Sequence, residues 1–151
     1  MFDLNQLDTH APAMAGRPMP ILDPRSGNPI YDADGKPVEI VLFGRNSDVY
    51  REVMRSVQQR RNERRMRNLQ QTEDEIRQDD FEVIVACTKG WNIPMLDGQP
   101  FPFSRENARK LWSDRRFNTL FERASRCIVD DANFLAMESP VSSGGPSDTS
   151  S

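Results

Sequence analysis

The sequence is poor in the residues that usually carry catalytic and metal chemistry. It has one histidine, His10, and two cysteines, Cys87 and Cys127, which lie far apart in the chain. A structural zinc site needs about four ligands, some of them closely paired, and this spacing does not supply them. A catalytic nucleophile needs a neighbouring base, and no Ser-His or Cys-His pair can be built on a single histidine near the start. With no phosphate-binding glycine loop or metal motif either, we expect no cofactor and no enzyme activity.

Long apolar runs are also missing, and we expect no secretory leader. No stretch approaches the roughly 20 apolar residues that a membrane helix needs. The opening MFDLNQLDTH lacks the basic and then apolar segments of a secretory signal. The cysteines form no CxxC arrangement, and we expect them to be buried and reduced. These absences predict a cytoplasmic protein without a membrane partner.

A general basic excess is absent as well. The net charge is −3 and the isoelectric point is about 5.2, whereas a dedicated DNA-binding domain usually carries a clear excess of lysine and arginine. Apolar residues make up 36% of the chain and charged residues 28%. This balance is typical of a small core with hydrophilic segments around it.

The pattern along the chain predicts an α+β fold in a single domain. A small antiparallel β-meander near the N-terminus should pack on a mainly α-helical body, and both termini should be disordered. The expected parts are a flexible N-terminal arm over residues 1–17, the meander over 18–44, the helical body over 45–137 and a disordered, low-complexity tail over 138–151.

The sequences of the arm and the meander give a few indications of their structure. Phe2, Leu4 and Leu7 in the arm could dock on the body or on a partner. Asp34-Gly35 favours a tight hairpin turn, and the many prolines of this region indicate short pairings at sheet edges. The expected strands cover residues 19–23, 29–32 and 37–43.

Helix signals follow from residue 47 onward. Ser47 and Ser104 are good N-caps, and Thr72 with Glu75 forms a capping box. Gly90 is placed to end the helix that the capping box begins. The last long helix carries the clearest apolar stripe, at Phe117, Leu120, Phe121, Ala124 and Ile128.

The stretch QQRRNERRMR, residues 58–67, concentrates positive charge, and an acidic stretch, EDEIRQDDFE, follows at residues 73–82. We expect the two to fold back as a helical hairpin in which the basic helix meets the acidic one. Two alternatives remain: an exposed arm for an acidic protein partner, and a nucleic-acid-binding helix. The last lacks interleaved aromatic residues for base stacking. It would use Arg60, Arg61, Arg64 and Arg65.

The segment WNIPMLDGQPFPF, residues 91–103, is unusually apolar for a loop and contains three prolines. It could fold over the core and bury its side chains, or it could form an apolar docking strip for a partner chain. Prolines suit the second interpretation because they reduce the entropy lost on binding. The candidate partner-binding residues are Trp91, Ile93, Met95, Phe101, Phe103 and, extending the strip, Trp112.

Three blocks of the sequence resemble a known protein family. They are MFDLNQLDT, DPRSGNPIYDADGKPVEIVLFGRNSDVYR and ACTKGWNIPMLDGQPFPFSRENARKLWSDRRFNTLFERASRCIVDDANFL. Together they look like a tail assembly chaperone of long-tailed bacteriophages. The likeness runs from Met1 to about Leu135. It rests on blocks in the same order rather than on a catalytic signature.

The resemblance implies a non-enzymatic role in the host cell cytoplasm. Such chaperones coat the tape measure protein and hold it soluble and extended while tail tube subunits polymerise around it. The tape measure protein is thus the expected partner, with the tail tube protein and self-association along the client as further contacts. Many of these chaperones also exist in a longer, frameshifted form, which would join after Leu135.

Two other functions stay open beside the chaperone. A structural protein of the neck or tail would be present in purified particles, whereas a chaperone would be absent from them. A nucleic-acid binder acting through the arginine-rich stretch would lose affinity steeply as salt rises.

Overall fold

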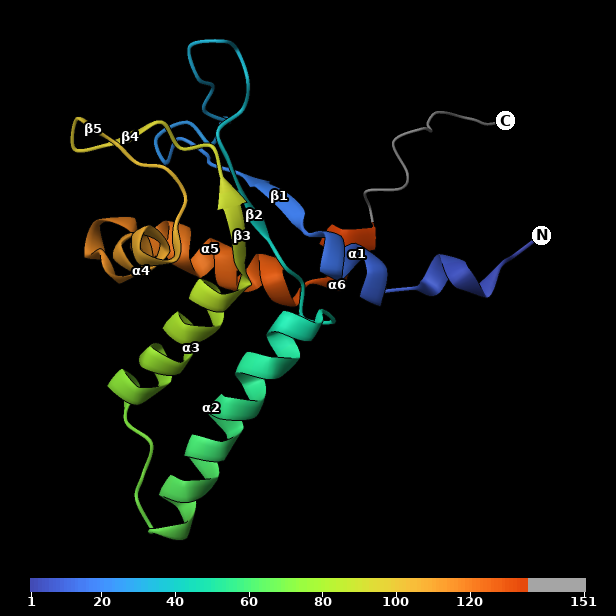
Figure 1. Ribbon diagram of the computed structural model, residues 1–151, viewed down its shortest axis with the longest axis vertical. Helices are drawn as coiled ribbons and strands as arrows, with labels where there is room; N and C mark the ends of the chain where they lie inside the picture. The colour runs from blue at the N-terminus through green and yellow to red at the C-terminus, as the bar shows by residue number, and fades with distance from the viewer. Residues whose placement is uncertain (136–151) are drawn as a thin grey trace.

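The computed structural model describes residues 1–135 and confirms the predicted α+β class. A three-stranded antiparallel sheet packs against short helices, and one long helical hairpin projects from this body (Figure 1). The predicted tail over residues 138–151 lies outside the described residues. The sheet has the order β1 (Arg17–Pro20), β2 (Glu39–Leu42), β3 (Thr88–Trp91), and the hairpin consists of α2 (Asp48–Met66) and α3 (Glu73–Cys87).

Shorter elements complete the chain on either side of the hairpin. A second sheet of two strands forms a small hairpin of its own beside the helices of the body. The remaining elements are η1 (Leu4–Leu7), α1 (His10–Ala15), β4 (Met95–Leu96), β5 (Gln99–Pro100), α4 (Arg105–Ser113), η2 (Arg115–Phe117), α5 (Asn118–Val129) and α6 (Asp131–Leu135).

The N-terminal arm expected over residues 1–17 is partly helical and partly packed. The Asp8 carboxylate accepts the backbone N–H groups of His10 and Ala11 at 2.8 and 3.1 Å, which starts α1. Ala13 in α1 is buried, and its carbonyl accepts the N–H of Gly44 at 3.2 Å. The segment before α1, residues 1–8, leads away from the body (Figure 1), and we call it the projecting arm.

The meander differs from its prediction in its middle strand. The expected strand over residues 29–32 is reduced to two isolated bridges, Leu22 with Pro29 and Tyr31 with Pro37. A proline has no N–H to donate, so two prolines in the pairing positions prevent a continuous ladder. The third strand of the sheet is instead β3, which follows α3 and pairs with β2.

The sequence predicted that Gly90 would end α3, and this prediction is wrong. The helix stops three residues earlier at Cys87, and Gly90 lies inside β3, opposite Val41. Thr88 is already extended, with φ −82° and ψ 112°, and its hydroxyl donates to the carbonyl of Ile84 at 2.6 Å. The long-range pairing of β3 with β2 therefore ends the helix before the glycine is reached.

The N-cap predictions are confirmed. Ser47 and Ser104 each accept the N–H three residues further on, at 3.2 and 3.0 Å. In the capping box, the N–H of Glu75 donates to the Thr72 hydroxyl at 3.1 Å, and the N–H of Thr72 donates to the Glu75 carboxylate at 2.9 Å. These bonds satisfy backbone donors that the first helical turn leaves unpaired.

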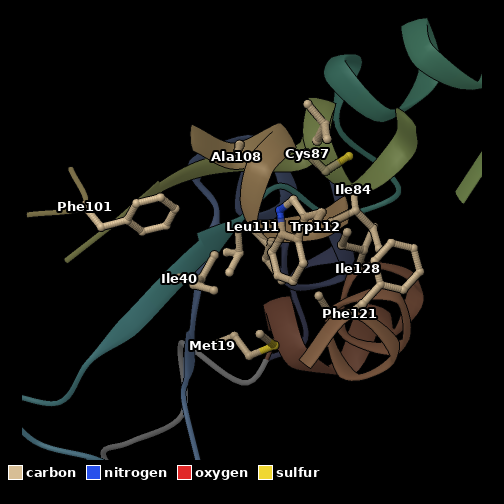
Figure 2. Packing of buried hydrophobic residues seen from close by; sticks show 13 residues of the cluster. Met19, Ile40, Ile84, Cys87, Phe101, Ala108, Leu111, Trp112, Phe121 and Ile128 are labelled. Atoms are coloured by element: carbon tan, nitrogen blue, oxygen red, sulfur yellow. The ribbon is translucent and has the colours of Figure 1, made fainter. Parts of the chain in front are cut away.

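The core lies between the sheet and helices α3, α4 and α5 (Figure 2). Trp112 is at its centre, packed edge-on against Phe121 with ring centroids 6.3 Å apart. The apolar stripe predicted for the last long helix supplies its innermost residues to this core. The buried members include Met19, Ile40, Leu42, Ile84, Leu111, Trp112, Phe121, Ala124 and Ile128.

Candidate functional site

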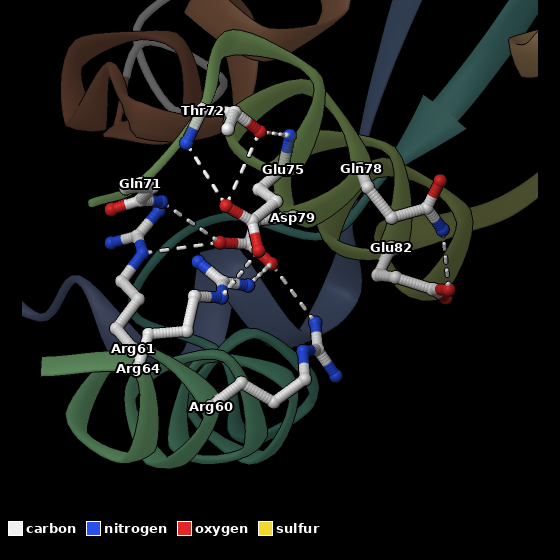
Figure 3. Close-up of polar contacts among 9 residues, drawn as sticks. All are labelled: Arg60, Arg61, Arg64, Gln71, Thr72, Glu75, Gln78, Asp79 and Glu82. Carbon is white, nitrogen blue, oxygen red and sulfur yellow. Dashed lines mark hydrogen bonds and ion pairs between the residues drawn. The ribbon is translucent and has the colours of Figure 1, made fainter. Parts of the chain in front are cut away.

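The arginine-rich stretch folds back on the acidic one, as predicted (Figure 3). The focus is Asp79 on α3, whose side chain is only 1% exposed. Arg60 Nη2 donates to its Oδ1 at 3.1 Å and Arg61 Nε to its Oδ2 at 3.2 Å. Arg64 lies 3.5 Å from the same carboxylate and 3.1 Å from that of Glu75. The hairpin is thus joined by several cations around one buried acid.

These ion pairs decide how the arginine-rich stretch is interpreted. Three of the four arginines considered for nucleic acid or an acidic partner already face carboxylates of their own chain. Arg65, the fourth, is exposed and makes no ion pair within residues 1–135. The pKa of Glu75 is lowered, first by the N–H of Thr72 and then by Arg64, so this acid stays charged beside the arginines. The stretch is therefore mainly a structural clamp.

The apolar loop after β3 folds over the core. The indole of Trp91 stacks on Phe101 with centroids 5.2 Å apart, meets Phe103 edge-on at 5.1 Å, and donates its N–H to the Phe101 carbonyl at 2.8 Å. Asp97 and Gly98 have φ of 52° and 79° and turn β4 into β5, at the position predicted. Arg116 holds this turn through the Asp97 carboxylate at 2.8 Å and lowers the pKa of that acid.

Burial divides the six residues proposed from sequence as a docking strip. Phe101 and Trp112 are buried in the core, and Trp91, Ile93 and Phe103 are partly buried against it. Met95 is 56% exposed and lies in β4 at the turned end of the loop. The loop therefore offers a partner one exposed side chain rather than a continuous strip. Sequence alone could not separate these roles, because all six are simply apolar.

Large apolar side chains are also exposed at Ile30 and Tyr31 between β1 and β2, at Val129, and in two further groups. The projecting arm carries Phe2, Leu4 and Leu7, with exposed fractions between 59% and 71%. The second group lies near the connection between α2 and α3: Met66 ends α2, Leu69 lies in the connection and Ile76 lies near the start of α3. It consists of Met66, Leu69 and Ile76, exposed between 42% and 84%, and we call it the hairpin tip.

The sequence indicated the projecting arm more clearly than the hairpin tip. The arm residues had been singled out as able to dock, since no periodic pattern ties them to the body. The only signal at the tip was the return of single apolar residues after a wholly polar stretch. The polar stretch over residues 58–65 predicts that this half of the helix projects from the core into solvent, as the structure shows. The spacing of Ile76 with Ile84 and Cys87 predicts a packed face, and this prediction is wrong for Ile76, which is 42% exposed.

Among the described residues, Cys87 is a deeply buried thiol with little reactivity. Burial raises the pKa of the Cys87 thiol to about 12, which keeps it in the unreactive protonated form. Cys87 and Cys127 are both free. Among residues 1–135, no three His, Cys, Asp or Glu side chains come together as a metal site would require, and no helix is long and apolar enough to cross a membrane.

No protein-family model, curated protein or solved structure matches the chain. The candidate surfaces are therefore defined by geometry: the projecting arm, the hairpin tip and Met95 at the turned end of the loop.

Proposed function

We propose that this protein is a tail assembly chaperone of long-tailed bacteriophages. It would bind the tape measure protein in the host cell cytoplasm and keep it soluble while the tail tube polymerises. The proposal starts from the three sequence blocks that resemble this family. The structural observation that supports it is the exposure of large apolar side chains on the projecting arm and the hairpin tip, outside the buried core.

The hairpin tip is the surface that we assign to the client. Large apolar side chains gathered on a protein surface mark sites of interaction. Met66 brings a flexible, polarizable side chain that adapts to varied apolar surfaces, and Leu69 and Ile76 add branched ones. Such a group suits repeated contacts with the apolar stripe of a long helical client. The ion pairs of Arg60 and Arg61 with Asp79 hold α2 and α3 of the hairpin together.

This assignment moves the client site away from the aromatic loop. Phe101 and Trp112 could reach a partner only if the core opened, because both are buried. Met95 remains available and could add a contact beside the tail tube or the client. Displacement by tail tube subunits would then require loss of weak surface contacts only.

The proposal is tested by co-expression of this chain with the tape measure protein, affinity capture and size-exclusion chromatography. We expect the client to become soluble and to elute with several copies of the chain. The variant M66S/L69S/I76S should keep the fold, by circular dichroism, and lose the client, because its substitutions remove the exposed tip. The matched control I30S/Y31S removes two other exposed apolar side chains and should retain the client.

Two outcomes would contradict the proposal. One is a client that stays insoluble while this chain elutes alone. The other is the presence of this chain in purified particles at a fixed copy number, which would favour a structural protein of the neck or tail.

A further inference from the structure

The connection between α2 and α3 has a backbone that hydrogen bonds hold in place. Asn68 has a φ of 58°, in the left-handed region, and its N–H donates to the Arg65 carbonyl at 3.0 Å. The N–H of Leu69 reaches back to the Arg64 carbonyl at 2.9 Å. These two bonds form a Schellman motif that ends α2, and the Thr72–Glu75 box then begins α3 (Figure 3). The hairpin tip is therefore ordered before anything binds to it.

Leu69 lacks the packing partner that this motif usually supplies. In a Schellman motif, the apolar residue after the left-handed position commonly contacts an apolar residue in the last turn of the helix. In α2 the corresponding positions are occupied by Glu63 and Arg64, which are both charged. Leu69 stays 56% exposed, and Met66 is 84% exposed. Apolar side chains that an ordered backbone holds in solvent are typical of a contact surface.

Charges of opposite sign lie on the two sides of this apolar group. Arg65 and Arg67 are at the end of α2, and we call them the basic edge. Glu73 and Asp74 are at the start of α3, and we call them the acidic edge. All four residues are exposed, and none of them makes an ion pair within residues 1–135. The hairpin tip thus has an apolar centre between two edges of opposite charge.

This pattern is complementary to itself. Figure 1 shows α2 and α3 side by side, joined at the connection. A two-fold axis at the tip, perpendicular to the plane of the two helices, places the end of α2 in one copy against the start of α3 in the other. The basic edge then meets the acidic edge twice, which favours the contact. We propose that two copies of the chain associate tip to tip in this way, with Met66 and Leu69 at the centre.

The size of the contact predicts a reversible dimer. Only the ends of two helices and their connection take part, because the hairpin projects from the body (Figure 1). Interfaces that bury less than about 1,200 Å² are typical of transient complexes. The same surface is used by both copies, so the association closes at two and does not extend into chains. We expect a dimer that forms at high concentration and dissociates on dilution.

The dimer covers the surface that we assign to the client, a consequence that rests on the proposed function. The free chain would keep its apolar tip out of water until the tape measure protein replaced the second copy. The contact itself needs no client. It can therefore be tested on this chain alone.

The first test is sedimentation velocity of the full chain at concentrations up to about 1 mM. We expect monomers and dimers and no larger species. Leu69→Ser should weaken the dimer by about tenfold or more, because it removes a central apolar side chain from both copies. The matched control is Ile30→Ser, which removes an exposed apolar side chain between β1 and β2 and should dimerise like the wild type.

A charge exchange tests the pairing of the two edges. The variants R65E/R67E and E73K/D74K each carry charge of one sign on both edges, so each should dimerise about tenfold more weakly or worse. Mixed, they should form a heterodimer with nearly the affinity of the wild type, because unlike edges meet again. R51E/R55E makes the same change in net charge at exposed positions near the start of α2 and should dimerise like the wild type.

The inference is overturned by a wild-type chain that stays monomeric at every concentration, or by folded charge variants that form no heterodimer when mixed. Circular dichroism melts check that each variant is folded. If E73K/D74K does not fold, R65E/R67E decides the question against its control R51E/R55E, and equal dimerisation of these two variants overturns the inference.

The two proposals fail separately. A chain that dimerises through its tip but captures no tape measure protein contradicts the proposed function and leaves the dimer standing. A chain that is monomeric when alone and captures the client does the reverse.

Discussion

The indole N–H of Trp112 donates to the hydroxyl of Thr88 at 2.9 Å, and both side chains are fully buried. The bond ties α4 to the first residue of β3, at the point where α3 ends. The Thr88 hydroxyl also donates to the Ile84 carbonyl at 2.6 Å, so one hydroxyl both accepts and donates inside the core. The two hydrogen bonds of this hydroxyl therefore connect α3, β3 and α4 inside the core.

We expect Thr88→Val to destabilise the protein by about 2 kcal/mol, since it leaves the buried indole N–H without an acceptor. Thr88→Ser keeps the hydroxyl and should cost clearly less. Urea unfolding followed by tryptophan fluorescence measures both. Equal costs for the two variants would show that the methyl group, and not the hydrogen bond, matters at this position.

Asp79→Asn should also destabilise the chain, by about 2–3 kcal/mol. It removes the buried charge that faces Arg60, Arg61 and Arg64, and breaking such a cluster from one side leaves its partners uncompensated. Glu63→Gln, an exposed acid on α2, is the control and should change stability by less than about 0.5 kcal/mol. Thermal melts at low and high salt would compare them. A stable Asp79→Asn protein would show that the clamp does not hold the hairpin.

In the aromatic loop, Phe101→Ala should cost about 3–4 kcal/mol, because it removes a buried ring that stacks on Trp91. Met95→Ala should leave stability within about 0.5 kcal/mol of the wild type. Both are measured by urea unfolding. If Phe101→Ala kept full stability and lost only partner binding, the loop would be a docking strip after all.

The capping box gives a pH dependence. The pKa of Glu75 lies below its ordinary value of 4.5, first because the Thr72 N–H binds the charged form. A carboxylate with a lowered folded-state pKa stabilises the protein above about pH 4.5 and loses this contribution as the pH falls through its folded value. Glu75→Gln keeps an acceptor for the box but does not titrate.

The wild type should therefore be more stable than Glu75→Gln near pH 7, and the difference should shrink below about pH 4. Thermal melts of both proteins across this range give the comparison. A difference that stays constant with pH would mean that the charge of Glu75 makes no contribution.

Local features of this fold were largely predictable. Three helices start with caps at Ser47, Ser104 and the Thr72–Glu75 box. Their hydrogen bonds join residues only three positions apart, so the local sequence is enough to predict where these helices begin. The hairpin followed from the opposition of basic and acidic stretches. The turn at Asp97-Gly98 lies where it was predicted. The tight turn predicted at Asp34-Gly35 is wider instead, because Asp34 does not have a positive φ and the bond closing the turn runs from Asp32 to Lys36.

Non-local features were not predictable. β3 covers four residues and becomes a strand only by pairing with β2, far earlier in the chain. Local signals at Gly90 instead suggested the end of a helix. Exposure of Met95 beside buried Phe101 is likewise decided by tertiary packing.

The separation of β2 from β3 in the sequence has a consequence for synthesis. The α2–α3 hairpin consists of local contacts and can form as soon as it leaves the ribosome, whereas the central strand of the sheet must wait for residues 88–91. At roughly 5–20 residues per second, β2 has an unpaired edge for seconds before its partner emerges. The hairpin then brings β3 back to that edge, so it is both the projecting element of the finished protein and the connection that closes the sheet.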